Sequence, residues 1–309
     1  RQSLEKLSTI LREKYSARIV YGDTDSNYVQ FPTLDSLPPQ DFFKRVREIA
    51  SEVSACFPHY MKLAVECVFA VFALLAGKCY LYETMDENGV PSGVIKGKGV
   101  ALIRRDTCDV HRDFLRELAR LVFNERYAEI NGFLSATVRR ILSGGVDAKK
   151  FVVTKSVGDM GAADNGGEVM AEEGANGKAK VGRYTVPKLS AVPEERETQL
   201  RRKNVDTDAE FYEHCLPAQM QLVTRMRARG EVVHVGSRIE YVVVRRSHEK
   251  AGYFDSVAAK SESYEYAMRH KLPIDYAWYV HYFSNSIDAL TSVVTKTTGV
   301  DIRKLKSFV

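Results

Sequence analysis

The sequence lacks the cysteine patterns that build disulfide frameworks and zinc sites. Its five cysteines are widely spaced and include no C-x-x-C pair, which predicts an intracellular protein. It also lacks an apolar run able to cross a bilayer as a helix of about 20 residues, because the longest, 65–76, is shorter and contains Glu66. An initiator methionine and a basic-then-apolar leader are missing too, and we therefore expect the chain to begin inside a longer protein.

A large excess of charge of one sign is absent as well. Lys and Arg number 45 against 40 for Asp and Glu, and so small an excess does not identify a nucleic-acid partner, since basic surfaces act through clustering. With 309 residues, 45% of them hydrophobic, the chain is long enough to bury a sizeable core in roughly two domains. Contacts with nucleic acid must therefore be sought in local clusters.

The first third of the sequence predicts a mixture of helices and antiparallel strands. Apolar residues recur at helical spacing in 1–15 and again in 40–57. Between them, 17–31 holds two β-branched and aromatic runs around a Gly-Asp-Thr-Asp turn, which is typical of a tight hairpin. The stretch 61–105 is rich in Val, Phe and Tyr and is broken at 86–89, which predicts strands around a turn.

From Thr107 onward, helical periodicity predicts a second, mostly helical domain. A helix is expected at 216–229, a strand at 238–245 and a helix at 263–269. Residues 158–204 are rich in Gly, Ala, Glu and Lys and almost free of aromatic side chains, which predicts a disordered insertion. The expected fold is thus α+β, with domains at 1–106 and 107–309.

The most informative motif is YGDTDS at 21–26. Strand alternation places Asp23 and Asp25 on one side of the predicted hairpin near its tip, and carboxylate oxygens are ligands that suit Mg²⁺. Two-metal phosphoryl transfer requires such carboxylates to be held rigidly together, which a hairpin provides. The alternative is an ordinary Asp-rich turn, because Asp and Gly are common turn residues.

This hexapeptide, set in a hydrophobic hairpin, resembles motif C of family-B DNA polymerases. The resemblance implies that Asp25 ligates both metal ions and that Asp23 lies beside them, so these two are the candidate catalytic and metal-binding residues. It also implies template-directed addition of deoxynucleotides to a primer 3′ end. The implied cofactor is Mg²⁺, as two ions shared with an aspartate that lies upstream of this chain in the family.

Two further segments continue the resemblance. LAVE at 63–66 and GKCY at 77–80 are similar to the L-E-F-E and K-K-R-Y elements of the family. The similarity implies that Lys78 and Tyr80 contact the primer terminus, and it makes Glu66 a possible supporting acid. Taken alone, Lys78 would be interpreted as a solvated lysine and Tyr80 as a core aromatic residue.

The segment KGKGVALIRRD at 96–106 resembles the K-G-x-E-x-x-R-R-D element that joins palm to thumb in the family. Its glycines permit a close backbone approach, and its lysines and arginines are suited to neutralise phosphates without reading sequence. The alternative is that Arg104 and Arg105 form surface ion pairs with the aspartates that follow them, each worth about 0–1 kcal/mol.

Later segments, at 151–156, 216–230, 236–243 and 272–276, resemble elements of the family's thumb. Arg225 and Arg229 share one helical face at i and i+4, which indicates either DNA contact or simple solvation. The residues predicted to contact primer or DNA are Tyr21, Thr24, Lys78, Tyr80, Lys96, Lys98, Gly99, Arg104, Arg105, Lys155, Arg225 and Arg229.

The order of these motifs implies the C-terminal part of a polymerase palm at 1–106 and a thumb at 107–309. The family motifs that supply the second metal-binding aspartate and hold the incoming nucleotide are not found, so the isolated chain is not expected to polymerise. The implied partners are primer–template DNA, deoxynucleoside triphosphates and a processivity factor, with no membrane. The long insertion, and the lack of the C-terminal cysteine pairs of cellular nuclear replicases, favour a large DNA virus as the source.

Two rival interpretations remain open at this stage. The first is a catalytically degenerate, polymerase-derived module that binds DNA or a partner. The departures from the family pattern that suggest it are Ala64, Gly77, Cys79 and Ala101. The second is a helical scaffold with an incidental acidic hairpin, which predicts no salt-dependent affinity for DNA.

Overall fold

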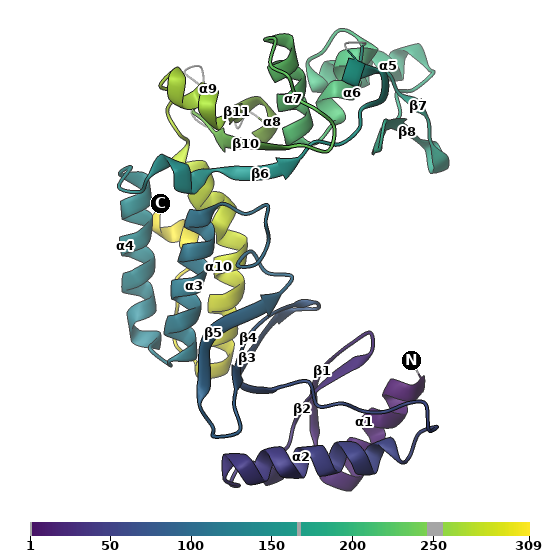
Figure 1. Cartoon of the computed structure of the whole chain (residues 1–309). Coiled ribbons are helices and arrows are strands. Elements are labelled where there is room, and N and C mark those ends of the chain that lie inside the picture. The colour runs from purple at the N-terminus through teal and green to yellow at the C-terminus, as the bar shows by residue number, and fades with distance from the viewer. Residues whose placement is uncertain (1, 166–167, 246–255) are drawn as a thin grey trace. The chain divides into compact units, whose positions relative to one another are not determined.

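The computed structural model describes residues 2–165, 168–245 and 256–309 (Figure 1). Helices and antiparallel sheets are both present, which confirms the predicted α+β class. The chain divides into two compact units, one of residues 1–103, 116–130 and 289–302, the other of 104–115, 131–288 and 303–309. No helix in the described ranges is both long and apolar enough to cross a membrane.

The first unit begins with two helices packed on a hairpin. α1 and α2 start and end close to the predicted helices, and Pro39 begins α2, where its fixed φ suits the first turn. Their apolar faces meet the hairpin in a buried core that includes Leu7, Leu11 and Val53. The bounds are α1 (Gln2–Tyr15), β1 (Arg18–Asp23), β2 (Ser26–Gln30) and α2 (Pro39–Ser54).

A three-stranded antiparallel sheet in order β3-β4-β5 completes this part of the first unit. The β4–β5 turn is held by Asp86, whose carboxylate accepts hydrogen bonds from the main-chain N–H groups of Asn88 and Val90 at 2.9 and 2.8 Å. Tyr28 of the hairpin stacks on Phe69 of the sheet, with ring centroids 5.8 Å apart. The bounds are β3 (Val68–Ala76), β4 (Cys79–Met85) and β5 (Pro91–Lys98).

Parts of three long helices lie in the core of the second unit. His111 of α3 stacks on Phe283 of α10 with centroids 4.4 Å apart, and Phe114 of α3 meets Phe133 of α4 edge to face at 5.5 Å. The bounds are α3 (Asp109–Phe123), α4 (Ile130–Leu142) and α10 (Tyr276–Thr298). Short 3-10 helices lie at Pro32–Leu34, Tyr127–Glu129, Ala148–Phe151, Gly161–Asn165, Ala175–Gly177 and Leu305–Phe308.

A second three-stranded antiparallel sheet, in order β11-β10-β6, lies in the same unit. The buried Tyr279 hydroxyl ties α10 to this region, because it donates to the Phe151 carbonyl at 2.9 Å and accepts from the Val243 N–H at 3.0 Å. The predicted helices near 216–229 and 263–269 and the strand at 238 are present. The bounds are β6 (Val153–Ser156), α7 (Ala218–Ala228), β10 (Arg238–Val243), α8 (Val257–Lys260), β11 (Ser261–Ser263) and α9 (Tyr264–Arg269).

The prediction of disorder for 158–204 has to be corrected for the described residues of that segment, which exclude 166–167. It forms a third three-stranded antiparallel sheet, β7-β8-β9, and a helix. Val181 and Val186 are buried, and Asp164 pairs with Arg227 at 2.7 Å, so a few apolar positions and one ion pair anchor the segment. The bounds are β7 (Glu172–Glu173), β8 (Lys178–Val181), β9 (Tyr184–Pro187), α5 (Pro193–Lys203) and α6 (Asp208–Cys215).

His111 makes the stability of the second unit depend on pH. Burial lowers the pKa of His111 from about 6.5 to about 4, because the ring is stacked on Phe283 and away from water. Between these values the unfolded chain binds more protons than the folded chain, so stability falls as the pH decreases. We expect the free energy of unfolding to drop by about 2 kcal/mol from this group between pH 7 and pH 5.

Urea unfolding of the 309-residue chain, followed by fluorescence of its single tryptophan, Trp278, measures this effect. His111→Phe should remove that part of the pH dependence, whereas His59→Gln, which changes an exposed histidine, should retain it. Equal pH slopes for the wild-type chain and His111→Phe would contradict the assignment.

Candidate active site

The YGDTDS motif forms the tip of the β1–β2 hairpin. Asp23 pairs with Ser26 across the strands, and Thr24 and Asp25 make a two-residue turn in which Thr24 has a φ of 55°. The Asp25 N–H and the Ser26 hydroxyl both donate to the Asp23 carbonyl, at 2.7 and 3.0 Å. The strand therefore ends at Asp23. Strand alternation was the basis for predicting that Asp23 and Asp25 lie on one side of the hairpin, but it does not extend into the turn that holds Asp25.

Asp23 is buried and already paired with two cations. Its side-chain oxygens lie 3.1 Å from Lys78 Nζ and 3.3 Å from Lys98 Nζ, although only 7% of the residue is exposed. The Thr24 hydroxyl donates to the same carboxylate at 3.1 Å. The hydrogen bond from Lys78, with help from Thr24 and Lys98, lowers the pKa of Asp23, and the carboxylate in turn raises the pKa of Lys98.

Asp25 differs from Asp23 in both exposure and partners. It is exposed, and among the described residues its carboxylate accepts no hydrogen bond and forms no ion pair. A carboxylate without a competing partner fits a hard divalent cation, whereas Asp23 is neutralised by its lysines. In the described part of the chain no three His, Cys, Asp or Glu side chains converge to hold a metal, so Asp25 would need carboxylates from elsewhere.

The turn that carries Lys78 is fixed by close contacts. Gly77 and Lys78 join β3 to β4, and Lys78 has a left-handed φ of 62°. Its main-chain N–H donates to the Tyr21 hydroxyl at 2.8 Å. Gly99, with a φ of 68°, packs against this turn so closely that an added Cβ would lie 2.2 Å from the Lys78 carbonyl oxygen. Gly99 is thus required by packing and needs no DNA contact to explain it.

Tyr80 lies in the core of the sheet. It is 4% exposed, its hydroxyl is 2.6 Å from that of Tyr28, and burial raises its pKa. Its position agrees with the alternative interpretation of a core aromatic residue. Tyr28 was missed by the sequence analysis, although its place opposite Tyr21 in the hairpin register could have identified it. Glu66 is exposed in the segment before β3 and bonds to neither aspartate.

Some of the basic residues in and after β5 already form ion pairs within the described part of the protein, and others do not. Arg104 donates twice to Asp106, at 3.1 and 3.0 Å, and Lys155 also pairs with Asp106. Burial alone would raise the pKa of Asp106, but the pairs with Lys155 and Arg104 lower it to about 2. Lys96 and Arg105 are exposed, and no bond to another described residue engages either side chain. The surface ion pair expected as the alternative for Arg104 is therefore present.

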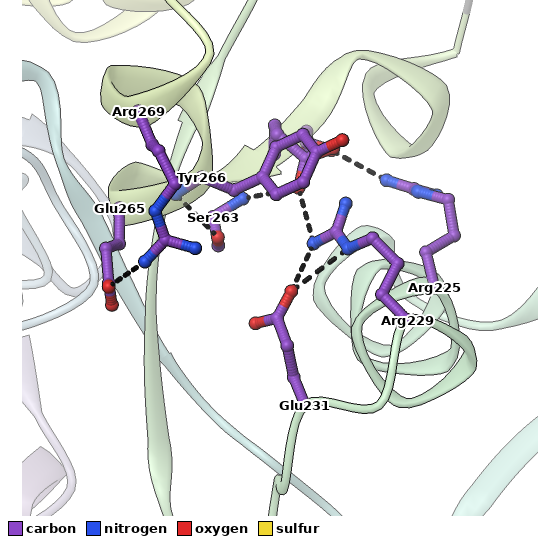
Figure 2. A network of polar contacts seen from close by, with 9 residues as sticks. Arg225, Arg229, Glu231, Ser263, Glu265, Tyr266 and Arg269 are labelled. Carbon is purple, nitrogen blue, oxygen red and sulfur yellow. Dashed lines mark hydrogen bonds and ion pairs between the residues drawn. The ribbon is translucent and has the colours of Figure 1, made fainter.

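The two arginines predicted to contact DNA, Arg225 and Arg229, make several contacts within the second unit (Figure 2). Arg225 donates to the main-chain carbonyl oxygens of Ser261 and Ala258, at 2.6 and 2.9 Å. Arg229 pairs with Glu231 at 2.7 Å and with Glu262 at 3.0 Å, and its guanidinium lies 3.9 Å from the centre of the Tyr266 ring. Their shared helical face was predicted correctly, but it packs on α8, β11 and α9.

Comparison with known proteins identifies the protein family to which this chain belongs. The profile of the family described as DNA polymerase family B matches residues 1–294, and the chain belongs to that family. It is 30% identical to DNA polymerase 120R of Invertebrate iridescent virus 3 over 95% of this chain and 26% of the relative. It is also 30% identical to the putative DNA polymerase 060R of Frog virus 3, over 100% of this chain and 30% of the relative.

A family B DNA polymerase of the archaeon Pyrobaculum calidifontis aligns in structure with 97% of this chain and 29% of its own, at 13% identity and a TM-score of 0.49. The chain spans between a quarter and a third of the length of these two viral relatives. It therefore corresponds to a part of those polymerases.

Proposed function

We propose that the full protein containing this chain is a DNA-directed DNA polymerase, which adds deoxynucleotides to a primer 3′ end under the direction of a template. The observation that carries the proposal is the exposed Asp25 carboxylate, which has no partner among the described residues. It lies at the tip of a rigid hairpin in a chain of DNA polymerase family B. Its relatives are named as DNA polymerases, which disfavours the degenerate module as an alternative.

Asp25 would serve as a metal ligand in this site, together with an aspartate contributed from outside this chain. The two Mg²⁺ ions, when bound, supply activation of the attacking hydroxyl and stabilisation of the leaving phosphate. Asp25 fits this task because it is a hard oxygen donor held by the hydrogen bonds of the turn. Asp23 supports it by fixing Lys78 and Lys98 beside the tip.

The two lysines would hold the primer strand close to Asp25. Their side chains are 70% and 61% exposed although both ammonium groups touch Asp23, so each keeps N–H donors free for a nucleic-acid acceptor. Lys96 and Arg105 are the exposed cations suited to neutralise backbone phosphates. We assign 1–106 to the palm and 107–309 to the thumb of such an enzyme, with primer–template DNA and deoxynucleoside triphosphates as substrates.

The viral origin of these two relatives supports a large DNA virus as the source, with replication in infected cells. A processivity factor is proposed as a further partner. Primer extension by the full-length protein tests the proposal. We expect incorporation of nucleotides that requires template, primer and Mg²⁺ and that stops when the metal is chelated. DNA binding without any extension, by a correctly folded full-length protein, would instead favour the degenerate module.

A further inference from the structure

The hydroxyl of Tyr21 makes one bond that links two separate elements. Tyr21 belongs to β1, and its oxygen accepts the main-chain N–H of Lys78, in the turn between β3 and β4, at 2.8 Å. Its ring also packs on Tyr28 and Tyr80, with centroids 5.4 and 6.0 Å away. This side chain was predicted to contact DNA, but its hydroxyl is already engaged within the protein.

The Lys78 N–H lies in the two-residue turn between β3 and β4. Gly77 and Lys78 form a two-residue connection closed by the pairing of Ala76 with Cys79, so the ladder of β3 and β4 does not use the N–H of Lys78. A left-handed φ is unfavourable for a residue with a side chain and persists where the surroundings enforce it. Two contacts hold the backbone of Lys78 in this conformation: the hydrogen bond to the Tyr21 hydroxyl and the close packing of Gly99.

Lys78 is consequently held to the hairpin at both ends. Its main-chain N–H is fixed by Tyr21 and its ammonium group by Asp23, at 3.1 Å. These two anchors are two residues apart on the same strand, which ends at the turn carrying Asp25. The position of the Lys78 ammonium group relative to Asp25 therefore depends on the Tyr21 hydroxyl.

We propose that Tyr21 is a positioning residue that acts through the backbone of Lys78 and sets where this lysine meets the primer strand. The inference rests on the polymerase function proposed above. Loss of the hydroxyl frees the Gly77–Lys78 turn while it leaves the aromatic packing and the Asp23 carboxylate in place. Primer affinity should fall as a result, whereas the dependence on Mg²⁺ should not change.

The test is Tyr21→Phe in the full-length protein, measured by single-turnover extension at increasing concentrations of primer–template. One neutral hydrogen bond of this kind corresponds to an apparent Kd raised about two- to tenfold, with the Mg²⁺ requirement unchanged. Tyr82→Phe is the matched control, because it deletes a hydroxyl from the same aromatic cluster. The Tyr82 hydroxyl has no hydrogen-bond partner among the described residues, so its removal should leave the Kd unchanged.

A double-mutant cycle with Lys78→Ala separates positioning from general destabilisation. If Tyr21 acts through Lys78, Tyr21→Phe raises the Kd in the wild-type background and adds little in the Lys78→Ala background. An equal effect in both backgrounds, or no effect in the wild type, overturns the inference. Failure of the wild-type protein to extend any primer is a different result, which refutes the proposed function. In that case the Kd values of the four proteins in the mutant cycle are measured by fluorescence anisotropy of labelled primer–template, which requires no catalysis.

Discussion

Asp25→Asn in the full-length protein is expected to reduce Mg²⁺-dependent primer extension at least about a thousandfold, a loss of roughly 4 kcal/mol of transition-state stabilisation. The substitution keeps the size of the side chain and the hydrogen bond from the Asp25 N–H to the Asp23 carbonyl, so the hairpin should fold as before. It removes the negative charge that a divalent cation requires. Rates of single-nucleotide incorporation, measured with saturating primer–template, give the result.

Two comparisons make this prediction specific. Asp35→Asn removes another exposed carboxylate from the first unit and should leave the incorporation rate unchanged. Primer–template affinity of Asp25→Asn, measured by fluorescence anisotropy, should remain close to that of the wild type. If Asp25→Asn retained more than about a tenth of the wild-type rate, the assignment of Asp25 as a metal ligand would be wrong.

Asp275→Ala is expected to give the largest loss of stability in the second unit, about 3–5 kcal/mol. Asp275 and Lys260 are 6% and 3% exposed, and the carboxylate lies 3.3 Å from the ammonium group. Removing Asp275 leaves Lys260 buried without this compensating charge. The same carboxylate accepts the Trp278 N–H at 3.0 Å at the start of α10, so the helix also loses its N-terminal cap.

Urea unfolding followed by Trp278 fluorescence measures this loss. Asp275→Asn keeps an oxygen for the cap but not the charge, and should fall between Asp275→Ala and the wild type. Glu265→Ala breaks the exposed pair between Glu265 and Arg269, and should cost less than about 1 kcal/mol. A similar small cost for Asp275→Ala would show that the buried pair contributes little.

The sequence predicted the parts of the site whose signals are local. The hairpin at 18–30 follows from β-branched and aromatic runs around Gly-Asp-Thr-Asp, and these residues interact with their own neighbours. The two lysine partners of Asp23 could not be found in this way. Lys98 is 75 residues away, and it reaches Asp23 only because the register of β4 and β5 brings it back to the hairpin.

The sequence could not predict which side chains become buried or which groups lie opposite them. Composition suggested disorder for 158–204, but an average over the segment hides the few buried positions, such as Val181 and Val186, that hold its sheet. Helical spacing placed Arg225 and Arg229 on one face correctly. It could not reveal that the carbonyl oxygen of Ser261 and the carboxylate of Glu262 lie opposite that face.

The buried Asp23 carboxylate is paired with two ammonium groups, so one of them can leave while the other remains. If Lys78 binds nucleic acid as proposed and its ammonium group leaves Asp23, Lys98 would still compensate the negative charge from 3.3 Å. With a single lysine, the same movement would leave a buried charge uncompensated, and the lysine would be held back by that cost. The second ammonium group would thus reduce the energetic cost of releasing the first, so that Lys78 would be positioned by the protein and still be able to bind in the proposed site.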